Sequence, residues 1–406
     1  MDLPEAGAIM ARVPGWRKIA ARLIMRYWLD LPWRLRTARD RQLTLGNALI
    51  GGLRKAMLDR GIDLVLRTSF VKFIACTGHV TGVIARRDGK EVSFHAARAV
   101  ILASGGFEQS QPKRDAYFPQ RTQANWSATP RGNNTGDILD AARDIGADTE
   151  FLDQAWWAPT ITMPTVPSLG DSRNIALFFE RGYPHSLCVN RLGNRFANEA
   201  CSYHQFGQAM LRDNAATGAN MPCWIIFDAT FRHNYPLGGL LPGWSRPDSK
   251  LPASWFDHFL FRADSIAALA AKIAVPAAAL AHTIDAFNAN ADQGEDPEFQ
   301  RGGNFYNQYF GDPANKPHRN LGAVRNAPFY AVRIDLGDLG SKGGPKTDAD
   351  ARVLDRDGRP ISGLYAIGNC AGSVMGPAYP GAGATLGSAM TFACAAVANI
   401  ARSNEP

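Results

Sequence analysis

Near the carboxyl end of the chain, an apolar stretch leads into a glycine-rich loop that could hold a ligand. Gly363–Ile367 is typical of a short strand, and Tyr379-Pro-Gly-Ala-Gly-Ala-Thr-Leu-Gly387 opens a helix over 384–400. Glycines let backbone N–H groups approach a ligand, and a helix N-terminus carries partial positive charge. We therefore expect this segment to face a flat, electron-rich ligand or a developing negative charge.

The spacing of these glycines departs from a known nucleotide-binding pattern. Gly381-x-Gly383-x-x-x-Gly387 has one residue more than G-x-G-x-x-G, and the acid expected about 20 residues later would fall at the chain end. A dinucleotide fingerprint is not expected here. Two interpretations stay open, which are direct contact with a ring system and a tight turn with close helix packing.

Two tyrosines are candidates for proton chemistry, Tyr203 and Tyr379. A phenol has a pKa of about 10, so as a base Tyr203 would need a neighbouring cation or donor to lower its pKa. As a hydrogen-bond donor, a neutral phenol needs no such help. With ten tyrosines in the chain, a structural role is the alternative for each.

Other kinds of site are not expected. The six cysteines form no C-x-x-C pair, so neither a zinc site nor a redox dithiol is predicted, and cysteine usage fits a reducing compartment. Residues 1–15 lack the pattern of a secretory signal, and no run of 18 apolar residues occurs. We expect a cytoplasmic protein.

The net charge of +7 comes from the first 60 residues, which hold twelve Lys and Arg against five Asp and Glu. These cations alternate with apolar residues between 12 and 41, which is a basic amphipathic pattern. The interpretations are contact with a membrane surface and a solvated helix face. Nucleic-acid binding is not expected, because no recognised module accompanies the charge.

The remaining elements predict an α/β domain interrupted by an insertion. A helix is expected over 44–60, strands over 63–68, 70–77, 80–86 and 91–95, and a buried strand that ends in Ala103-Ser-Gly-Gly106. A helix is expected over 138–145, and residues 164–341 differ in composition, with helices at 266–272 and 276–290. We expect a first part of the α/β domain over 1–163, an inserted catalytic domain over 164–341 and a closing part over 342–406.

Together these segments resemble the 3-ketosteroid Δ1-dehydrogenases, within the fumarate reductase and succinate dehydrogenase flavoprotein group. The stretches that carry the resemblance lie between 44 and 400: 103–107, 133–137, 154–157, 189–190, 193–199, 309–313, 327–331, 337–344 and 363–392. The resemblance implies an FAD-binding Rossmann-like domain with an inserted α+β catalytic domain. It also implies a 3-ketosteroid substrate, an external electron acceptor and a role in steroid catabolism.

The resemblance implies roles for particular residues. Tyr379 and the Gly383 N–H would hold the C3 ketone, and Tyr203 would take the C2 proton while hydride passes from C1 to the flavin. Candidate pocket walls are Trp156, Trp157, Phe178 and Phe179, and core packing is the alternative for each. The residues expected to contact FAD are Ala103, Ser104, Gly105, Gly106, Thr135, Gly136, Asp137, Gly368, Asn369, Ala384, Thr385 and Leu386.

Members of that family begin with a βαβ unit carrying G-x-G-x-x-G and have a further tyrosine upstream. Residues 1–42 join the family pattern after both, so we expect an N-terminally incomplete chain. Two alternatives to the dehydrogenase are a non-catalytic remnant or half of a split flavoprotein, and a related Δ4-(5α) steroid dehydrogenase or enoate reductase. A dicarboxylate reductase is disfavoured, because Tyr379–Gly387 contains no arginine.

Overall fold

The structure is a computed structural model that describes residues 5, 9, 15–76, 78–164 and 173–402. The chain divides into two compact units, Met1–Thr68 and Ser69–Pro406. The predicted features of residues 1–4 and 10–14 lie outside the described residues.

The first unit is helical where it is described. Its helices are α2 (Trp16–Leu29), α3 (Leu31–Arg34) and α4 (Leu45–Asp59), and none of them buries a residue. The helix predicted over 44–60 is confirmed by α4. The strand predicted over 63–68 is wrong: residues 62–66 form no strand, and Leu64 and Leu66 are exposed. An apolar run forms a strand only when a neighbouring strand pairs with its backbone, and none does so here.

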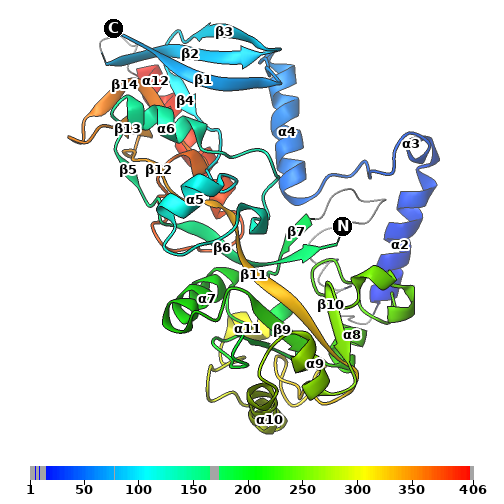
Figure 1. Cartoon of the computed structure of the whole chain (residues 1–406). Coiled ribbons are helices and arrows are strands. Elements are labelled where there is room, and N and C mark those ends of the chain that lie inside the picture. The colour runs from blue at the N-terminus through cyan, green and yellow to red at the C-terminus, as the bar shows by residue number, and fades with distance from the viewer. Residues whose placement is uncertain (1–4, 6–8, 10–14, 77, 165–172, 403–406) are drawn as a thin grey trace. The chain divides into compact units, whose positions relative to one another are not determined.

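The second unit contains a six-stranded mixed sheet that carries the predicted α/β elements (Figure 1). In it β14 runs parallel to β2 and β4, and β2 is antiparallel to β3. The turn between β2 and β3 is Asp88-Gly89, where both residues have positive φ as a tight hairpin requires. The strands are β1 (Thr68–Cys76), β2 (His79–Arg87), β3 (Lys90–His95), β4 (Val100–Leu102), β13 (Arg352–Leu354) and β14 (Pro360–Ala366).

A second sheet of six antiparallel strands is built from residues between 155 and 341. Its order is β7-β6-β11-β9-β8, with β10 also paired to β11. The strands are β6 (Ala155–Met163), β7 (Arg173–Ala176), β8 (Ser186–Val189), β9 (Cys223–Phe227), β10 (Leu260–Ala263) and β11 (Phe329–Ser341). A two-stranded sheet pairs β5 (Thr149–Glu150) with β12 (Gly344–Pro345). The three-part domain division stays a prediction.

The helices of the second unit lie around these sheets. The α-helices are α5 (Gln111–Tyr117), α6 (Asp137–Asp144), α7 (Tyr203–Thr217), α8 (Ala229–Asn234), α9 (Ile266–Lys272), α10 (Ala277–Gln293), α11 (Phe305–Tyr309) and α12 (Ala384–Arg402). Short 3₁₀ helices span Ala124–Trp126, Glu180–Gly182, Asp248–Lys250, Ala253–Trp255 and Gly368–Cys370. The helices predicted at 138–145, 266–272, 276–290 and 384–400 are confirmed.

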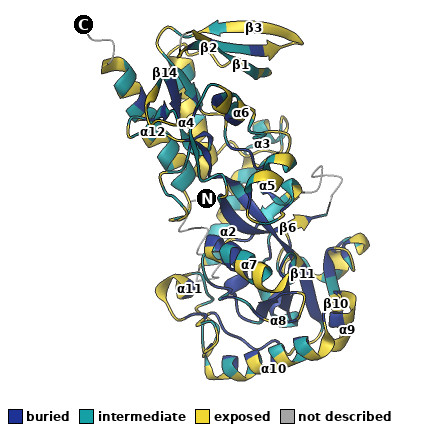
Figure 2. Cartoon of the chain, turned by 60° about the vertical axis from the view of Figure 1, so that its left-hand side comes forward, coloured by how far each residue is buried: buried dark blue, intermediate teal, exposed yellow. Residues whose placement is uncertain are grey.

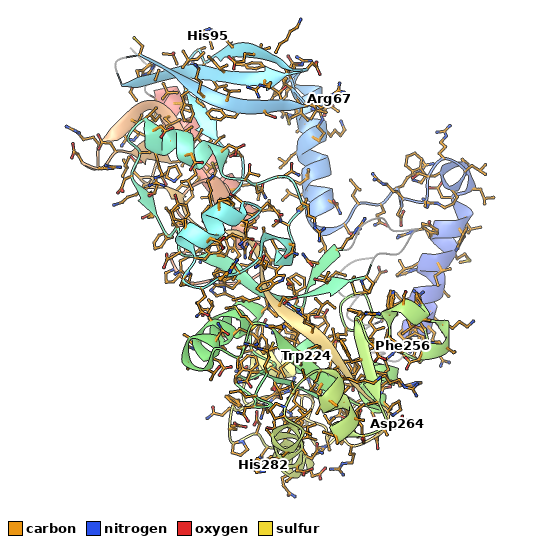
Figure 3. The ribbon with its side chains drawn as sticks, viewed as in Figure 1. Arg67, His95, Trp224, Phe256, Asp264 and His282 are labelled. Carbon is orange, nitrogen blue, oxygen red and sulfur yellow. The ribbon has the colours of Figure 1, made fainter. Side chains whose placement is uncertain are left out.

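The second sheet is buried on both faces at its centre, and Figure 2 shows β6 and β11 in dark blue. Successive side chains of a strand point to opposite faces. Ile225 of β9 accordingly packs in one apolar cluster with residues of α7, whereas Trp224 and Ile226 pack in another with α9 and α10. Trp224, labelled in Figure 3, also meets Phe261 of β10 edge to face. This two-sided core explains the continuous apolar run of β9.

Among the described helices, only α12 is long and apolar enough to cross a membrane by length and composition. The sequence contains no run of 18 apolar residues and so predicts no such helix. Ala396 of α12 packs in an apolar cluster with Ala351 and Tyr365, the latter from β14. Most of its other residues are partly or fully exposed.

Candidate functional site

The structure brings Tyr203 and Tyr379 together, with ring centroids 5.2 Å apart in an edge-to-face contact. Tyr203 begins α7, whose start is capped by the Ser202 hydroxyl accepting from the amide of Gln205. Gly207 lets α7 approach β6, because a Cβ there would stand 2.8 Å from the Cβ of Trp157. Two residues far apart in sequence are thus held in one place by a helix and a loop.

A catalytic base at Tyr203 was expected to need a neighbour that lowers its pKa, and the surroundings of the two tyrosines do the opposite. The Tyr203 hydroxyl is buried and makes no hydrogen bond within the described residues. Burial, and then the neighbouring Tyr379 hydroxyl, raise the pKa of Tyr203. Burial also raises the pKa of Tyr379. Both phenols are therefore neutral at neutral pH, and no cation of the described chain lowers the pKa of Tyr203.

Of the four predicted wall residues, two contact the tyrosines. The ring of Trp156 lies 4.7 Å from that of Tyr379, and Phe178 meets Tyr203 at 5.1 Å. Trp157 points to the opposite face of β6 and packs on Phe118, because neighbouring residues of a strand alternate. Phe179 stacks on Phe310 instead.

The predicted cofactor residues gather at the carboxyl ends of two parallel strands. Ala103 and Ser104 follow β4 and are exposed, and the Ser104 hydroxyl lies 3.3 Å from the sulfur of Cys370, just after β14. Gly105 has a positive φ, and a Cβ there would stand 2.5 Å from Oδ1 of Asn134. The two predicted segments 103–106 and 135–137 are therefore adjacent.

Gly136 connects the second of these segments to its helix. It has φ +73 and precedes α6, whose first residue is Asp137, and the Thr135 hydroxyl donates to the Asp137 carboxylate at 2.9 Å. A Cβ on Gly136 would stand 2.6 Å from Cβ of Phe107. Only glycine combines this backbone conformation with such close packing.

Three of the remaining predicted cofactor residues, Gly368, Asn369 and Ala384, border two neighbouring cavities, whereas Thr385 and Leu386 line neither. Gly368 and Asn369 line a cavity of about 280 Å³ with Trp156 and Lys342. The start of α12, including Gly383 and Ala384, lines a more open space of about 550 Å³. The two spaces share Val374, Ser388 and Phe392. Tyr379 is not among the residues that line either space, so its predicted shared grip with Gly383 stays a prediction.

These residues fit a flavin dinucleotide. Gly381 and Gly383 have positive φ, a backbone conformation that favours glycine. Apart from chain neighbours and the helix's own backbone, no described atom lies within 4 Å of where a Cβ of Gly381, Gly383 or Gly387 would stand, so a ligand would have room to approach the backbone there. At the start of α12 the Ala384 amide donates to the Gly381 carbonyl and the Gly387 amide donates to the Gly383 carbonyl. Ligands of α/β folds bind at the carboxyl ends of parallel strands.

Two buried titratable residues lie beside the tyrosines, His204 and Lys342. Neither was among the predicted site residues, and the sequence indicated an ordinary polar role for His204. His204 directly follows Tyr203, and its ring contacts that of Tyr379 at 5.6 Å. The ammonium of Lys342 lies 4.3 Å from the ring centroid of Trp156. The signal for Lys342 was its place in Gly-Ser-Lys-Gly-Gly after a long strand, a stretch already selected for the resemblance.

Known proteins share these features along most of the chain. The model of the family described as "FAD binding domain" matches residues 5–386. A Mycobacterium tuberculosis protein named 3-oxosteroid 1-dehydrogenase is 39% identical over 88% of this chain and 63% of its own length. A Comamonas testosteroni protein of the same name is 36% identical over 98% of this chain and 68% of its own length.

A solved structure is similar throughout. The 3-ketosteroid Δ1-dehydrogenase of Sterolibacterium denitrificans, in complex with 1,4-androstadiene-3,17-dione, is 45% identical and covers 100% of this chain and 72% of its own, with a TM-score of 0.94. The chain spans 62% to 68% of the length of the first curated relatives that it matches. These matches confirm the α/β FAD-binding fold and FAD as the cofactor. The chain belongs to the FAD-dependent 3-ketosteroid Δ1-dehydrogenase family.

Proposed function

We propose that this protein catalyses the FAD-dependent 1,2-dehydrogenation of a 3-ketosteroid, with an external electron acceptor. The observation that carries the proposal is the contact, in an apolar cluster, of Tyr203 at the start of α7 with Tyr379 on the loop that leads to the glycine turn; their ring centroids lie 5.2 Å apart. The relatives' names and the steroid bound to the Sterolibacterium structure support the substrate class. The other interpretations, including a non-catalytic remnant, have no comparable support.

The chain's own groups would divide the work as follows. The neutral Tyr379 hydroxyl would donate to the C3 ketone oxygen, together with the Gly383 N–H. This polarisation acidifies the C2–H bond, and one such donor typically contributes about 3 to 4 kcal/mol. The C2 proton would pass to the oxygen of the Tyr203 phenolate, the deprotonated form that a phenol must take to act as a base. The chemistry that FAD supplies when bound is acceptance of the C1 hydride.

The decisive experiment is an assay of product with a 3-keto-4-ene steroid and an artificial electron acceptor, after flavin absorbance has shown that FAD is bound. We expect the 1,4-diene. Tyr379→Phe should lower kcat by about 10²-fold to 10³-fold, because it removes one oxyanion donor. Tyr330→Phe, which removes a phenol bonded to Asp248, is the control and should keep its activity.

The raised pKa of Tyr203 adds a pH test. If its phenolate form is the base, kcat/KM should keep rising with pH up to at least pH 10. A protein that binds no FAD, a product other than the 1,4-diene, or a Tyr203→Phe variant with full activity would each contradict the proposal.

We also propose that the first unit contacts an anionic membrane surface on the cytoplasmic side. The apolar side chains of Ile24 and Trp28 on α2, of Leu31 on α3 and of Leu35 just after α3 are 60% or more exposed, while cations lie between them. Such a face binds lipid through apolar burial and charge attraction.

Co-flotation with vesicles tests this contact. Binding to phosphatidylglycerol vesicles should exceed binding to phosphatidylcholine vesicles, and Trp28→Ser should reduce it several-fold. Val92→Ser, a change at an exposed apolar residue of β3, is the matched control. Equal binding to both vesicles, or none, would rule the contact out.

A further inference from the structure

Two buried titratable side chains hold successive backbone carbonyls of the loop that carries Tyr379. Nε2 of His204 lies 3.1 Å from the carbonyl oxygen of Pro377. The Lys342 ammonium donates to the carbonyl of Ala378 at 2.5 Å. His204 is 4% exposed and Lys342 is fully buried. The two groups come from different elements, α7 and the segment after β11, and meet on adjacent peptides.

The same two side chains are connected to the tyrosine pair. His204 directly follows Tyr203 and contacts the Tyr379 ring. Lys342 lies over one aromatic ring, Trp156, and that ring contacts Tyr379 at 4.7 Å. A shift of either carbonyl would therefore move the Tyr379 hydroxyl relative to Tyr203.

This arrangement is costly for the fold, which argues against a purely structural role. Among the described residues Lys342 makes no ion pair, and burial lowers its pKa to about 8. A carbonyl only accepts hydrogen bonds, so Nε2 of His204 carries the hydrogen, and its buried Nδ1 is left without a partner. Unpaired buried polar groups destabilise a protein by about 1 to 3 kcal/mol. Apolar residues of similar size would fill the same space without that cost.

We propose that His204 and Lys342 are positioning residues that fix the Tyr379 hydroxyl beside Tyr203 by holding the carbonyls of Pro377 and Ala378. This inference rests on the proposed function for its chemical meaning. The two residues do not touch the substrate. They set the distance between the donor that polarises the ketone and the base that takes the proton, and a small error in such a distance costs rate rather than binding.

The first test needs no activity. Hydrogen–deuterium exchange is measured on the full chain, without added FAD, for peptides that cover 374–383. Lys342→Met keeps the side-chain length and removes the donor, so these peptides should exchange at least ten-fold faster, while peptides of α10 are unchanged. Lys346→Met, a change at a half-exposed lysine nearby, is the control and should leave the exchange unaltered.

The second test is the division of the effect between kcat and KM in the FAD-loaded protein. Lys342→Met and His204→Leu should each lower kcat at least ten-fold and change KM less than three-fold. His204→Gln, whose amide can donate to the same carbonyl, should recover most of the lost rate. A melting temperature within a few degrees of wild type shows that each variant has folded.

The outcomes separate this inference from the proposed function. Unchanged exchange at 374–383 in Lys342→Met overturns the inference whether or not the enzyme is active. Faster exchange with unchanged kcat also overturns it, because the loop would then be held without effect on the reaction. A wild-type protein that binds FAD and makes no 1,4-diene overturns the proposed function, and the exchange experiment still decides whether the two side chains hold the loop.

Discussion

Two polar regions lie within ten residues of each other before and at the start of α7, and they are satisfied to very different degrees. In the first, Arg195 donates two hydrogen bonds to Glu199 and two to Asp296. Arg301 adds contacts to Glu199 and to two backbone carbonyls. In the second, the Tyr203 hydroxyl and Nδ1 of His204 are buried without a hydrogen bond of normal geometry; in the first, Nε of Arg301 is the one such atom among the described residues.

The difference indicates which region serves the fold and which serves a reaction. Buried charges are tolerated when each one is paired, and the attraction of Arg195 and Arg301 lowers the pKa of Glu199 against its burial. Unpaired polar atoms in a core are rare and call for an explanation. At Tyr203 the explanation we propose is that a substrate supplies the missing partner.

The largest loss of stability is expected when the buried ion network around Glu199 is disrupted. Glu199→Ala would leave two buried guanidinium groups without their shared carboxylate, and we expect a loss of about 4 kcal/mol in the free energy of unfolding. Urea denaturation measures this loss. Glu298→Ala is the control, because that carboxylate is 59% exposed and should cost less than about 1 kcal/mol. Equal losses in the two variants would show that the network is not what stabilises this region.

We expect almost no loss of stability when the buried hydroxyl of Tyr203 is removed. Tyr203→Phe removes a hydroxyl that has no protein partner, so the free energy of unfolding should change by less than about 0.5 kcal/mol. Tyr365→Phe removes a hydroxyl bonded to Asn399 at 2.8 Å and should cost about 1 kcal/mol. Both values come from urea denaturation at neutral pH. A Tyr203→Phe variant that loses as much as Tyr365→Phe would mean that the Tyr203 hydroxyl has a stabilising partner.

The smallest expected effect concerns pH and His204. Burial chiefly, with repulsion from Lys342, lowers the pKa of His204 below its ordinary value near 6.5. As the pH falls below about 6.5 the unfolded chain takes up a proton that the folded chain refuses, so this residue makes the fold less stable in acid. His204→Gln should flatten the slope of unfolding free energy between pH 7 and pH 5. His95→Gln, at an exposed position of β3, should leave the slope unchanged.

Much of the fold could be predicted from sequence because the patterns are local. The apolar run that forms β4, the glycine at 146 that follows α6 and the apolar spacing of α10 each depend on neighbours a few residues away. The strand predicted over 63–68 failed because a strand depends on a partner elsewhere in the chain. Trp157 packs on Phe118 and Phe179 stacks on Phe310, away from the tyrosine pair, and composition does not say which face a side chain takes.

For this chain, the sequence alone determined the kinds of chemistry available: glycine turns that admit a ligand, two tyrosines, and the family resemblance that joined them. Only the tertiary structure decided that Tyr203 and Tyr379 touch, that burial raises the pKa of both, and that His204 and Lys342 hold the loop between them. The physical reason is that hydrogen bonding and desolvation act through distances in space. Residues 203, 342 and 379 are far apart in sequence. They become neighbours only because helix α7 packs on β6 and the loop before α12 lies beside both.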